Sequence, residues 1–238
     1  MPHRSQFYSI QESCSYLPTQ SSRLEYEEAP DLTALEYASR LQHGWRRFGA
    51  SLFRPQCLHC QACQSLRVDV DRFQPNRSQR RNRTRNEGDV ELIIGEPKLT
   101  RERLSLYDRY HRFQASFKGW DEPIEGDPFS YHQSFLNNPI ATEEWCYQFD
   151  GKLVGFGFVD HLPGVGLSAI YLIHDPSYRD RGLGTWNVLR LIEECQIREL
   201  PHLYLGYFVS GCQSLEYKAS FIPNQVLRPD GVWAAFRQ

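Results

Sequence analysis

The chain contains no apolar run that approaches the length of a membrane-spanning helix, and residues 1–7 lack the apolar core of a signal peptide. We therefore expect a protein with no membrane partner that resides in the cytoplasm, where its seven cysteines stay reduced. No repeat or low-complexity linker interrupts the 238 residues. Because 40% of the residues are hydrophobic and 13% are aromatic, the chain can bury a core and is not disordered.

Lysine is scarce, since only four of the 27 basic residues are lysines. Arginines instead concentrate in residues 72–86, which contain no acidic residue and carry a charge of +6. Because the whole chain carries −2, the remainder carries −8. Arginine binds phosphate through paired hydrogen bonds, so we expect this strip to contact a nucleic-acid backbone; the alternative is a solvated charged surface. The expected contacts are Arg77, Arg80, Arg81, Arg83 and Arg85.

The chain also lacks the second CxxC pair of a zinc ribbon, although three cysteines recur in Cys57-x-x-Cys60-x-x-Cys63. Thiolates at this spacing can bind one ion, and Cys14 is the expected fourth ligand. The pattern predicts a possible zinc ion or iron–sulfur cluster. The alternatives are a buried group of thiols and a redox-active loop.

Residues 167–205 have the pattern of a strand, a glycine-containing turn, a helix and a second strand. The turn reads Arg179-x-x-Gly182-Leu183-Gly184. Glycines allow backbone N–H groups to approach a ligand closely, and the following helix directs its positive end to the same place. The turn therefore predicts a site for a phosphate or a developing oxyanion, with an ordinary tight turn as the alternative.

Residues 145–236 resemble the acetyltransferase-like (GNAT) fold in their order of elements. They read as a hairpin at Asp150-Gly151, a long strand, the glycine turn, a helix, a strand and closing strands. The resemblance implies an α/β (α+β) chain with a mixed sheet, in which the turn lies between two splayed strands. We expect a GNAT-like domain over residues 91–238 and a smaller region over residues 1–90 that holds the cysteines and the arginine strip.

Several motifs resemble the aminoacyl-tRNA–protein transferases of the N-degron pathway, and together they cover nearly the whole chain. They include Cys14-Ser-Tyr-Leu-Pro, Gly44-Trp-Arg-Arg-Phe-Gly, the cysteine cluster, His174-Asp-Pro, Tyr204-Leu-Gly-Tyr and Tyr217-Lys-Ala-Ser-Phe. The length and the spaced third cysteine are most similar to the bacterial aspartate/glutamate leucyltransferases, since arginyltransferases are much longer and carry paired cysteines. Gly182 departs from the family pattern, in which serine is common at this position.

The resemblance implies transfer of leucine from Leu-tRNA to the α-amine of a protein that begins with Asp or Glu, which marks the protein for degradation. No cofactor is needed for the chemistry, because the ester is already activated. Three alternatives stay open: an arginyl-tRNA–protein transferase, an acetyl-CoA-dependent N-acetyltransferase and a non-catalytic metal-containing RNA-binding module.

Aminolysis of an ester by an α-amine needs positioning, an oxyanion donor and a route for the proton more than it needs a strong base. We expect Tyr207, Tyr217 and Lys218 to position groups or transfer protons, and Asp175 to orient the turn. An acceptor carboxylate calls for an arginine, and the candidates are Arg46 and Arg47, with Arg23 behind them. We expect Arg179, Gly182, Leu183 and Gly184 to bind the aminoacyl-tRNA. The apolar pocket for the leucyl side chain cannot be located from sequence.

Overall fold

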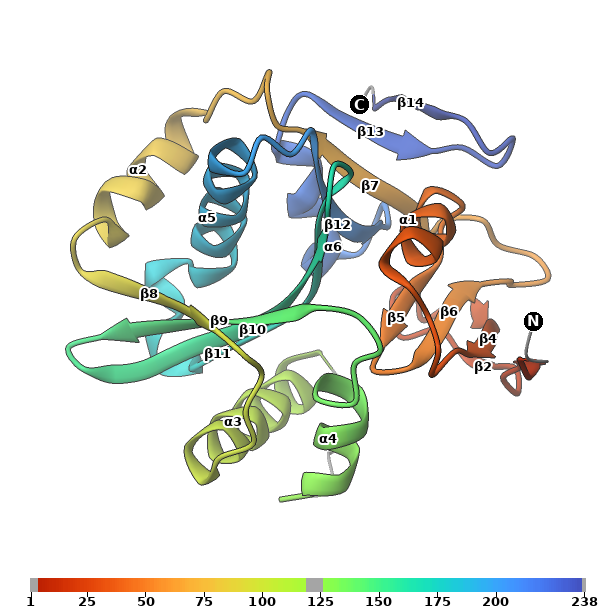
Figure 1. The fold of residues 1–238 in the computed structure, drawn as a ribbon, viewed down its shortest axis with the longest axis horizontal. Coiled ribbons are helices and arrows are strands. Elements are labelled where there is room, and N and C mark those ends of the chain that lie inside the picture. The colour runs from red at the N-terminus through yellow and green to blue at the C-terminus, as the bar shows by residue number, and fades with distance from the viewer. Residues whose placement is uncertain (1–3, 119–125, 237–238) are drawn as a thin grey trace.

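One large mixed sheet organises the part of the chain that the computed structural model describes, residues 4–118 and 126–236. Its strands are β7 (Gln64–Asp69), β8 (Val90–Gly95), β9 (Thr142–Phe149), β10 (Lys152–Leu162), β11 (Gly166–His174), β12 (His202–Phe208), β13 (Asn224–Leu227) and β14 (Trp233–Ala235). Their order in the sheet is β14-β13-β7-β12-β11-β10-β9-β8 (Figure 1). The mixed α/β class expected from the sequence is confirmed.

Strands β9 and β10 form the hairpin that the Asp150-Gly151 pair predicts. Both residues have positive φ angles, 51° and 70°, as the tight turn of a two-residue hairpin requires. Alternate residues of β9 face opposite sides of the sheet, so Trp145 and Tyr147 join one core cluster and Cys146 joins another.

Strands β11 and β12 are parallel neighbours that separate soon after they meet. Their pairing comprises Leu167 with Leu203 and Ser168 with Tyr204. Helix α5 (Leu183–Ile197) connects the two strands. This splayed pair followed by the glycine turn is the arrangement expected of a GNAT-like fold, and that prediction is confirmed.

Helices cover both faces of the sheet (Figure 1). Helix α5 packs on one face, with α2 (Arg77–Asn86) beside it. Helices α3 (Arg101–Lys118) and α4 (Pro128–Phe135) pack on the other face. The short elements η1 (Pro176–Arg181), α6 (Gln213–Glu216) and η2 (Tyr217–Ser220) lie in the loops around β11 and β12. No helix among the described residues is long and apolar enough to cross a membrane.

The N-terminal residues build a second, four-stranded sheet in the order β1-β4-β6-β5. Its strands are β1 (Gln6–Tyr8), β4 (Leu24–Glu28), β6 (Ser51–Pro55) and β5 (Arg46–Phe48), and β2 (Glu12–Ser13) pairs with β3 (Ser21–Ser22) nearby. Helix α1 (Ala34–Gln42) covers the sheet and begins at the Thr33 cap, close to the expected start.

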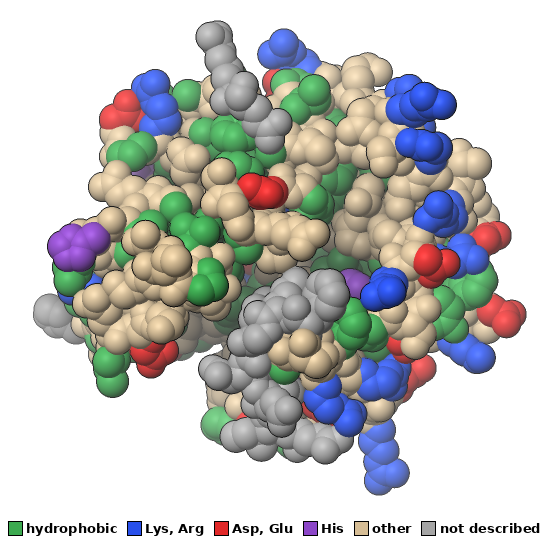
Figure 2. Space-filling view, turned by 180° about the vertical axis from the view of Figure 1, so that it is seen from behind, with side chains coloured by type: hydrophobic (Ala, Val, Ile, Leu, Met, Phe, Trp, Pro, Cys, Tyr) green, Lys and Arg blue, Asp and Glu red, His purple; other side chains and the backbone are tan. Residues whose placement is uncertain are grey.

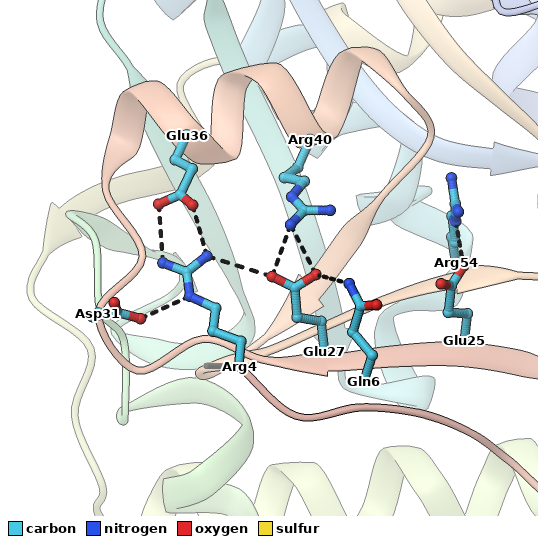
Figure 3. A network of polar contacts seen from close by, with 8 residues as sticks. All are labelled: Arg4, Gln6, Glu25, Glu27, Asp31, Glu36, Arg40 and Arg54. Carbon is cyan, nitrogen blue, oxygen red and sulfur yellow. Dashed lines mark hydrogen bonds and ion pairs between the residues drawn. The ribbon is translucent and has the colours of Figure 1, made fainter. Parts of the chain in front are cut away.

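A polar network fastens this sheet to α1 (Figure 3). Glu27 is 1% exposed, and its carboxylate accepts from Arg40 at 2.8 Å and from Gln6 at 2.9 Å. Arg4 adds contacts to Glu36 at 2.7 Å and Asp31 at 2.8 Å. The Glu27 charge is buried but paired, which is how proteins tolerate such a group.

The two sequence regions expected to divide near residue 90 share the large sheet. Strand β7, from the first region, lies between β12 and β13 of the second. Arg47 of β5 is also buried against Asp160 of β10, with both side chains 0% exposed. Residues on both sides of the expected boundary near residue 90 therefore belong to the same large sheet.

Candidate active site

A cavity of about 1080 Å³ opens where β11 and β12 separate. Its walls come from β5, β6, α3, β10, β11, β12, the first turns of α5, the η2 segment and the loop around Cys14. The cavity therefore collects residues from both sheets. Of the residues expected from sequence to form the site, it brings together Arg46, Tyr207, Tyr217, Lys218, Gly184 and Cys14.

The described residues that line the cavity include basic side chains but no acidic ones. Arg46 and Lys218 lie in its wall, whereas the described residues that line it include no aspartate or glutamate. Another part of the wall is aromatic: the Phe48 ring stacks on Phe53 with 5.4 Å between centroids and meets Tyr171 edge-on at 6.0 Å. A ligand here meets cations and apolar rings, and no described carboxylate.

Each of the two cations is held by one of the separating strands. Nη2 of Arg46 donates to the carbonyl of Ala169 in β11. Nζ of Lys218 donates to the carbonyl of Tyr207 in β12 at 2.9 Å. These bonds fix both side chains at the opening between the strands.

Lys218 is the most perturbed cation of the site. Burial of the amine, followed by the nearby charge of Arg46, lowers the pKa of Lys218 to about 7. A substantial fraction of this amine is neutral near pH 7. Because a neutral amine that donates one N–H still has its lone pair, Lys218 can accept a proton there.

The two tyrosines differ in their availability. The Tyr207 hydroxyl donates to the Gly44 carbonyl at 2.9 Å, and burial raises the pKa of Tyr207 well above its usual value. These contacts give Tyr207 a structural part in the cavity wall. Tyr217 is 39% exposed as a residue. Burial of its hydroxyl, and then the nearby Tyr110, nevertheless raise the pKa of Tyr217 to about 12, so it remains protonated at neutral pH.

Arg47 and Arg23 do not line the cavity. Arg47 points to the other side of β5, where its guanidinium contacts Asp160 and the carbonyl of Gly49. These contacts correct the expectation that Arg46 and Arg47 act together. Arg23 lies over the ring of Tyr8, 4.3 Å from its centroid.

Asp175 also lies outside the cavity wall. Its carboxylate caps the start of η1 by accepting from Ser177 N at 2.9 Å, and it accepts from Arg109 at 2.9 Å. The hydrogen bonds from Ser177 and Arg109 outweigh partial burial, so the pKa of Asp175 is lowered. Asp175 therefore caps η1 and is not among the residues that line the cavity.

The glycine turn divides its residues between packing and cavity. Gly182 has a φ angle of 63°, and a Cβ there would lie 2.6 Å from the Asn82 amide of α2. Leu183 is buried in the core, whereas Gly184 lines the cavity. Arg179 is exposed. Packing against α2 therefore explains the glycine at position 182 without a ligand.

The arginine strip forms helix α2, which docks on α5 and the glycine turn through polar residues. Asn82 and Asn86 donate to the Arg181 carbonyl, each at 2.9 Å, and Gln79 donates to the Ser220 carbonyl at 3.2 Å. The capping box of Asn76 and Gln79 starts the helix.

The opposite face of α2 carries exposed arginines. Arg77, Arg80 and Arg81 are exposed and form no ion pair within the described part of the chain. Arg83 instead pairs with Glu193 at 3.1 Å, and Arg85 contacts the Asp180 carbonyl. Figure 2 shows Lys and Arg side chains gathered along the side of the molecule where α2 lies.

The four cysteines expected to bind a metal line a second, smaller cavity of about 310 Å³. Burial, and then the neighbouring thiols of Cys14, Cys57 and Cys60, raise the pKa of Cys63 to about 12. Within residues 4–118 and 126–236, however, no three His, Cys, Asp or Glu side chains are placed to hold one metal ion. The geometry as it stands does not fit a metal, and the zinc or iron–sulfur site stays a prediction.

Helix α3 supplies cavity residues that sequence reasoning did not select, notably Tyr110 and Gln114. Both are buried, at 8% and 5% exposure. A glutamine on the inward face of α3 was the available signal, since buried polar side chains are uncommon.

Comparison with known proteins identifies the family. Residues 12–81 match the family described as arginine-tRNA-protein transferase, N terminus, and residues 102–228 match its C terminus. The aspartate/glutamate leucyltransferase of Campylobacter jejuni is 35% identical over 225 residues, which cover 93% of this chain and 92% of that protein. The enzyme of the same name from Marinobacter nauticus is 38% identical over 228 residues, covering 92% and 91%.

Solved structures support the fold alone. FemX is 7% identical, with a TM-score of 0.50 over 88% of this chain and 80% of its own. A conserved protein of unknown function from Bacteroides thetaiotaomicron is 16% identical, with a TM-score of 0.51 over 69% and 57%. The two family matches and the relatives that span nearly the whole chain agree with the splayed fold, and the chain belongs to the aminoacyl-tRNA–protein transferase family.

Proposed function

We propose that this enzyme transfers leucine from Leu-tRNA to the N-terminal α-amine of proteins that begin with Asp or Glu. One observation carries the proposal: the cavity has Arg46 and Lys218 in its wall, aromatic rings beside them, and no carboxylate among its described lining residues. The names of the similar Campylobacter and Marinobacter enzymes support the same activity. The proposed reaction would take place in the cytoplasm, where charged tRNA is found.

The acceptor carboxylate would bind Arg46. A guanidinium has five N–H donors, and Nη2 of Arg46 is the one that donates to Ala169. The remaining donors can form the paired hydrogen bonds that a carboxylate prefers. Asp and Glu acceptors would also neutralise the charge of Arg46, which holds down the pKa of Lys218, so the correct acceptor would make the amine of Lys218 more basic.

The lining favours leucine over arginine as the transferred residue. An arginyl side chain would bring a third cation beside Arg46 and Lys218, without a described carboxylate in the wall to pair with it. A leucyl side chain needs only apolar contact, which the partly buried Phe48 and Tyr171 offer. This charge argument separates two alternatives that the sequence left open.

Lys218 would receive the proton of the attacking amine. The acceptor nitrogen forms a bond to the leucyl carbonyl carbon, and the proton that it loses passes to neutral Lys218. The bond from that carbon to the tRNA 3′-oxygen then breaks, and the proton returns to the leaving oxygen. Tyr217, which is protonated at neutral pH and adjacent in sequence, would donate a hydrogen bond to the reacting ester.

The tRNA would lie along the exposed face of α2 and reach the cavity past the start of α5. Arg77, Arg80 and Arg81 supply unpaired positive charge for the phosphates. Gly184, in the first turn of α5, leaves open space at the cavity wall. Arg179 and the backbone at Leu183 remain candidates for the acceptor end.

Two further alternatives lose support. The acetyltransferase alternative was based on the GNAT-like order of elements over residues 145–236, and Gly182 adds little to it, because its positive φ angle and the nearby Asn82 amide favour glycine without a ligand. A non-catalytic RNA-binding module gives no reason for a partly buried lysine in the wall of a large cavity, with its pKa lowered to about 7. The metal prediction can be tested separately by elemental analysis of anaerobically purified protein. The proposed proton transfers and leucyl transfer do not use a metal.

One assay tests the proposed function. The protein is incubated with Leu-tRNA, Arg-tRNA or acetyl-CoA and with matched peptides that begin with Asp, Glu, Arg or Ala, and peptide mass is followed. We expect leucine addition to the Asp and Glu peptides only. Arginine addition, acetylation, or an unmodified peptide in every reaction would contradict the proposal.

A further inference from the structure

Gln114 presents a buried acceptor that the structure leaves unused. The residue is 5% exposed on α3, and its side chain lines the large cavity. Its neighbour one turn earlier, Tyr110, forms a side-chain hydrogen bond with it. Oε1 of Gln114 nevertheless has no hydrogen-bond partner among the described residues. A buried amide oxygen without a partner is costly, so a ligand that donates to it would relieve that cost.

The transferred amino acid carries a group of the required kind. Besides its side chain and ester, an aminoacyl residue has an α-amino group with several N–H donors and, when protonated, a positive charge. No described carboxylate lines the cavity, so a neutral amide oxygen is an available acceptor for this group. An amide oxygen can bind such a group without a charge that would also attract an arginyl side chain.

The neighbours of Gln114 connect it to the aromatic wall. Tyr110 contacts Tyr171, with 6.3 Å between ring centroids, and Tyr171 contacts Phe48 at 6.0 Å. The acceptor oxygen and the apolar rings therefore belong to one continuous surface. An α-amino acid bound there can place its amine at the amide and its aliphatic side chain on the rings.

We propose that Oε1 of Gln114 binds the α-amino group of the leucyl residue and, with Phe48 and Tyr171, forms the aminoacyl subsite. This inference rests on the proposed function. It makes Gln114 a residue that recognises the α-amine of the donor, while Arg46 recognises the acceptor.

The test compares two donors that differ only at the α-position: Leu-tRNA and the same tRNA charged with 4-methylpentanoate, which lacks the α-amine. Their kcat/KM ratio is measured with an Asp-peptide in the wild-type enzyme and in Q114M, which removes the acceptor oxygen. The α-amine also changes the intrinsic reactivity of the ester, so the ratio is compared between enzymes. We expect Q114M to lower the ratio at least about tenfold, mainly through slower reaction of Leu-tRNA.

Two variants complete the design. Q114E restores an acceptor oxygen and should recover most of the ratio, and Q133M, at an exposed position on α4, should leave it at the wild-type value. Q114L replaces Q114M if the latter does not fold. A ratio in a folded Q114M or Q114L within about twofold of the wild type overturns the inference while leaving leucyl transfer intact. A wild-type enzyme that transfers leucine to no peptide overturns the proposed function itself, and this inference with it.

Discussion

Arg46 and Lys218 each donate a hydrogen bond to a backbone carbonyl of one of the two strands that separate at the cavity, Arg46 to Ala169 in β11 and Lys218 to Tyr207 in β12. One cation therefore stands on each side of the opening. The charge of Arg46 also helps to lower the pKa of Lys218. Replacing either residue should consequently change the behaviour of the other.

Removing the amine of Lys218 should abolish a pH-dependent limb of the activity. The wild-type kcat/KM should rise with pH through about 7 as Lys218 becomes neutral, and rise again as the acceptor amine titrates near 8. K218M should lose the first limb and about 100-fold or more in rate. The exposed Lys152 gives the matched control, K152M, which should retain both limbs. A K218M profile with an unchanged limb near 7 would exclude Lys218 as the proton acceptor.

The same substitution should stabilise the folded protein. Lys218 has a pKa of about 7 when folded and 10.5 as a free side chain, so the unfolded state binds the proton more tightly. The resulting loss of stability begins as pH falls below 10.5 and is complete below about 7. After allowance for the lost bond to Tyr207, K218M should unfold with a free energy on the order of 1–3 kcal/mol larger at pH 7. Thermal melts at pH 7 and pH 10 test the sign, because the difference between K218M and wild type should narrow at the higher pH.

Substitution of Arg46 should affect both acceptor selectivity and the pH profile. R46Q should raise KM for Asp and Glu peptides about tenfold or more and reduce the preference for Asp over Asn peptides. Because a positive neighbour is lost, the limb assigned to Lys218 should move to higher pH. An R46Q enzyme with unchanged selectivity and an unchanged limb would show that the acceptor carboxylate binds elsewhere.

Arg47 should behave differently although it is the next residue. R47M leaves Asp160 buried without its partner, which typically costs about 3–5 kcal/mol. We expect R47M to melt at much lower temperature or to accumulate unfolded, whereas R46Q stays folded. Circular dichroism melts of the two variants make the comparison, and a fully stable R47M would show that the buried pair contributes little.

The exposed arginines of α2 should control tRNA affinity and its dependence on salt. Replacing Arg77, Arg80 and Arg81 with serine should weaken tRNA binding, and the slope of log K against log salt should fall by about 2–3. Arg228 is exposed and pairs with Asp230, so R228S serves as the control for loss of a surface arginine elsewhere. Filter-binding titrations at several salt concentrations measure both quantities, and equal slopes in wild type and the triple variant would rule out this surface.

Local patterns of the sequence predicted the elements that frame the site. The Asp150-Gly151 pair predicted the hairpin, because the local chemistry of the turn dictates it. The splayed strands were instead implied by the resemblance of the order of elements to the GNAT fold. The membership of the cavity is different, because Arg46, Gln114, Ala169 and Lys218 come together only through the arrangement of distant elements.

Neighbouring residues show why individual roles were harder to assign. Arg46 and Arg47, neighbours in the Gly44-Trp-Arg-Arg-Phe-Gly motif, were both selected as candidates to bind the acceptor carboxylate. The segment is strand β5, in which successive side chains point to opposite faces, so one arginine reaches the cavity and the other is buried. Gly182 was expected to bind the aminoacyl-tRNA, and its close contact with Asn82 of α2 depends on an arrangement of distant elements that the local sequence does not reveal.

Strand β7 has a consequence for when the enzyme can become active during its own synthesis. Its residues pair with both β12 and β13, as in Val68 with Leu203 and Leu66 with Val226. A ribosome therefore releases β7 long before either partner exists, and most of the chain must emerge before the strand is enclosed on both sides. The wall of the cavity that contains Tyr207 is completed at the same late stage. The nascent chain therefore has no assembled active-site cavity at the time when its own N-terminus emerges from the ribosome.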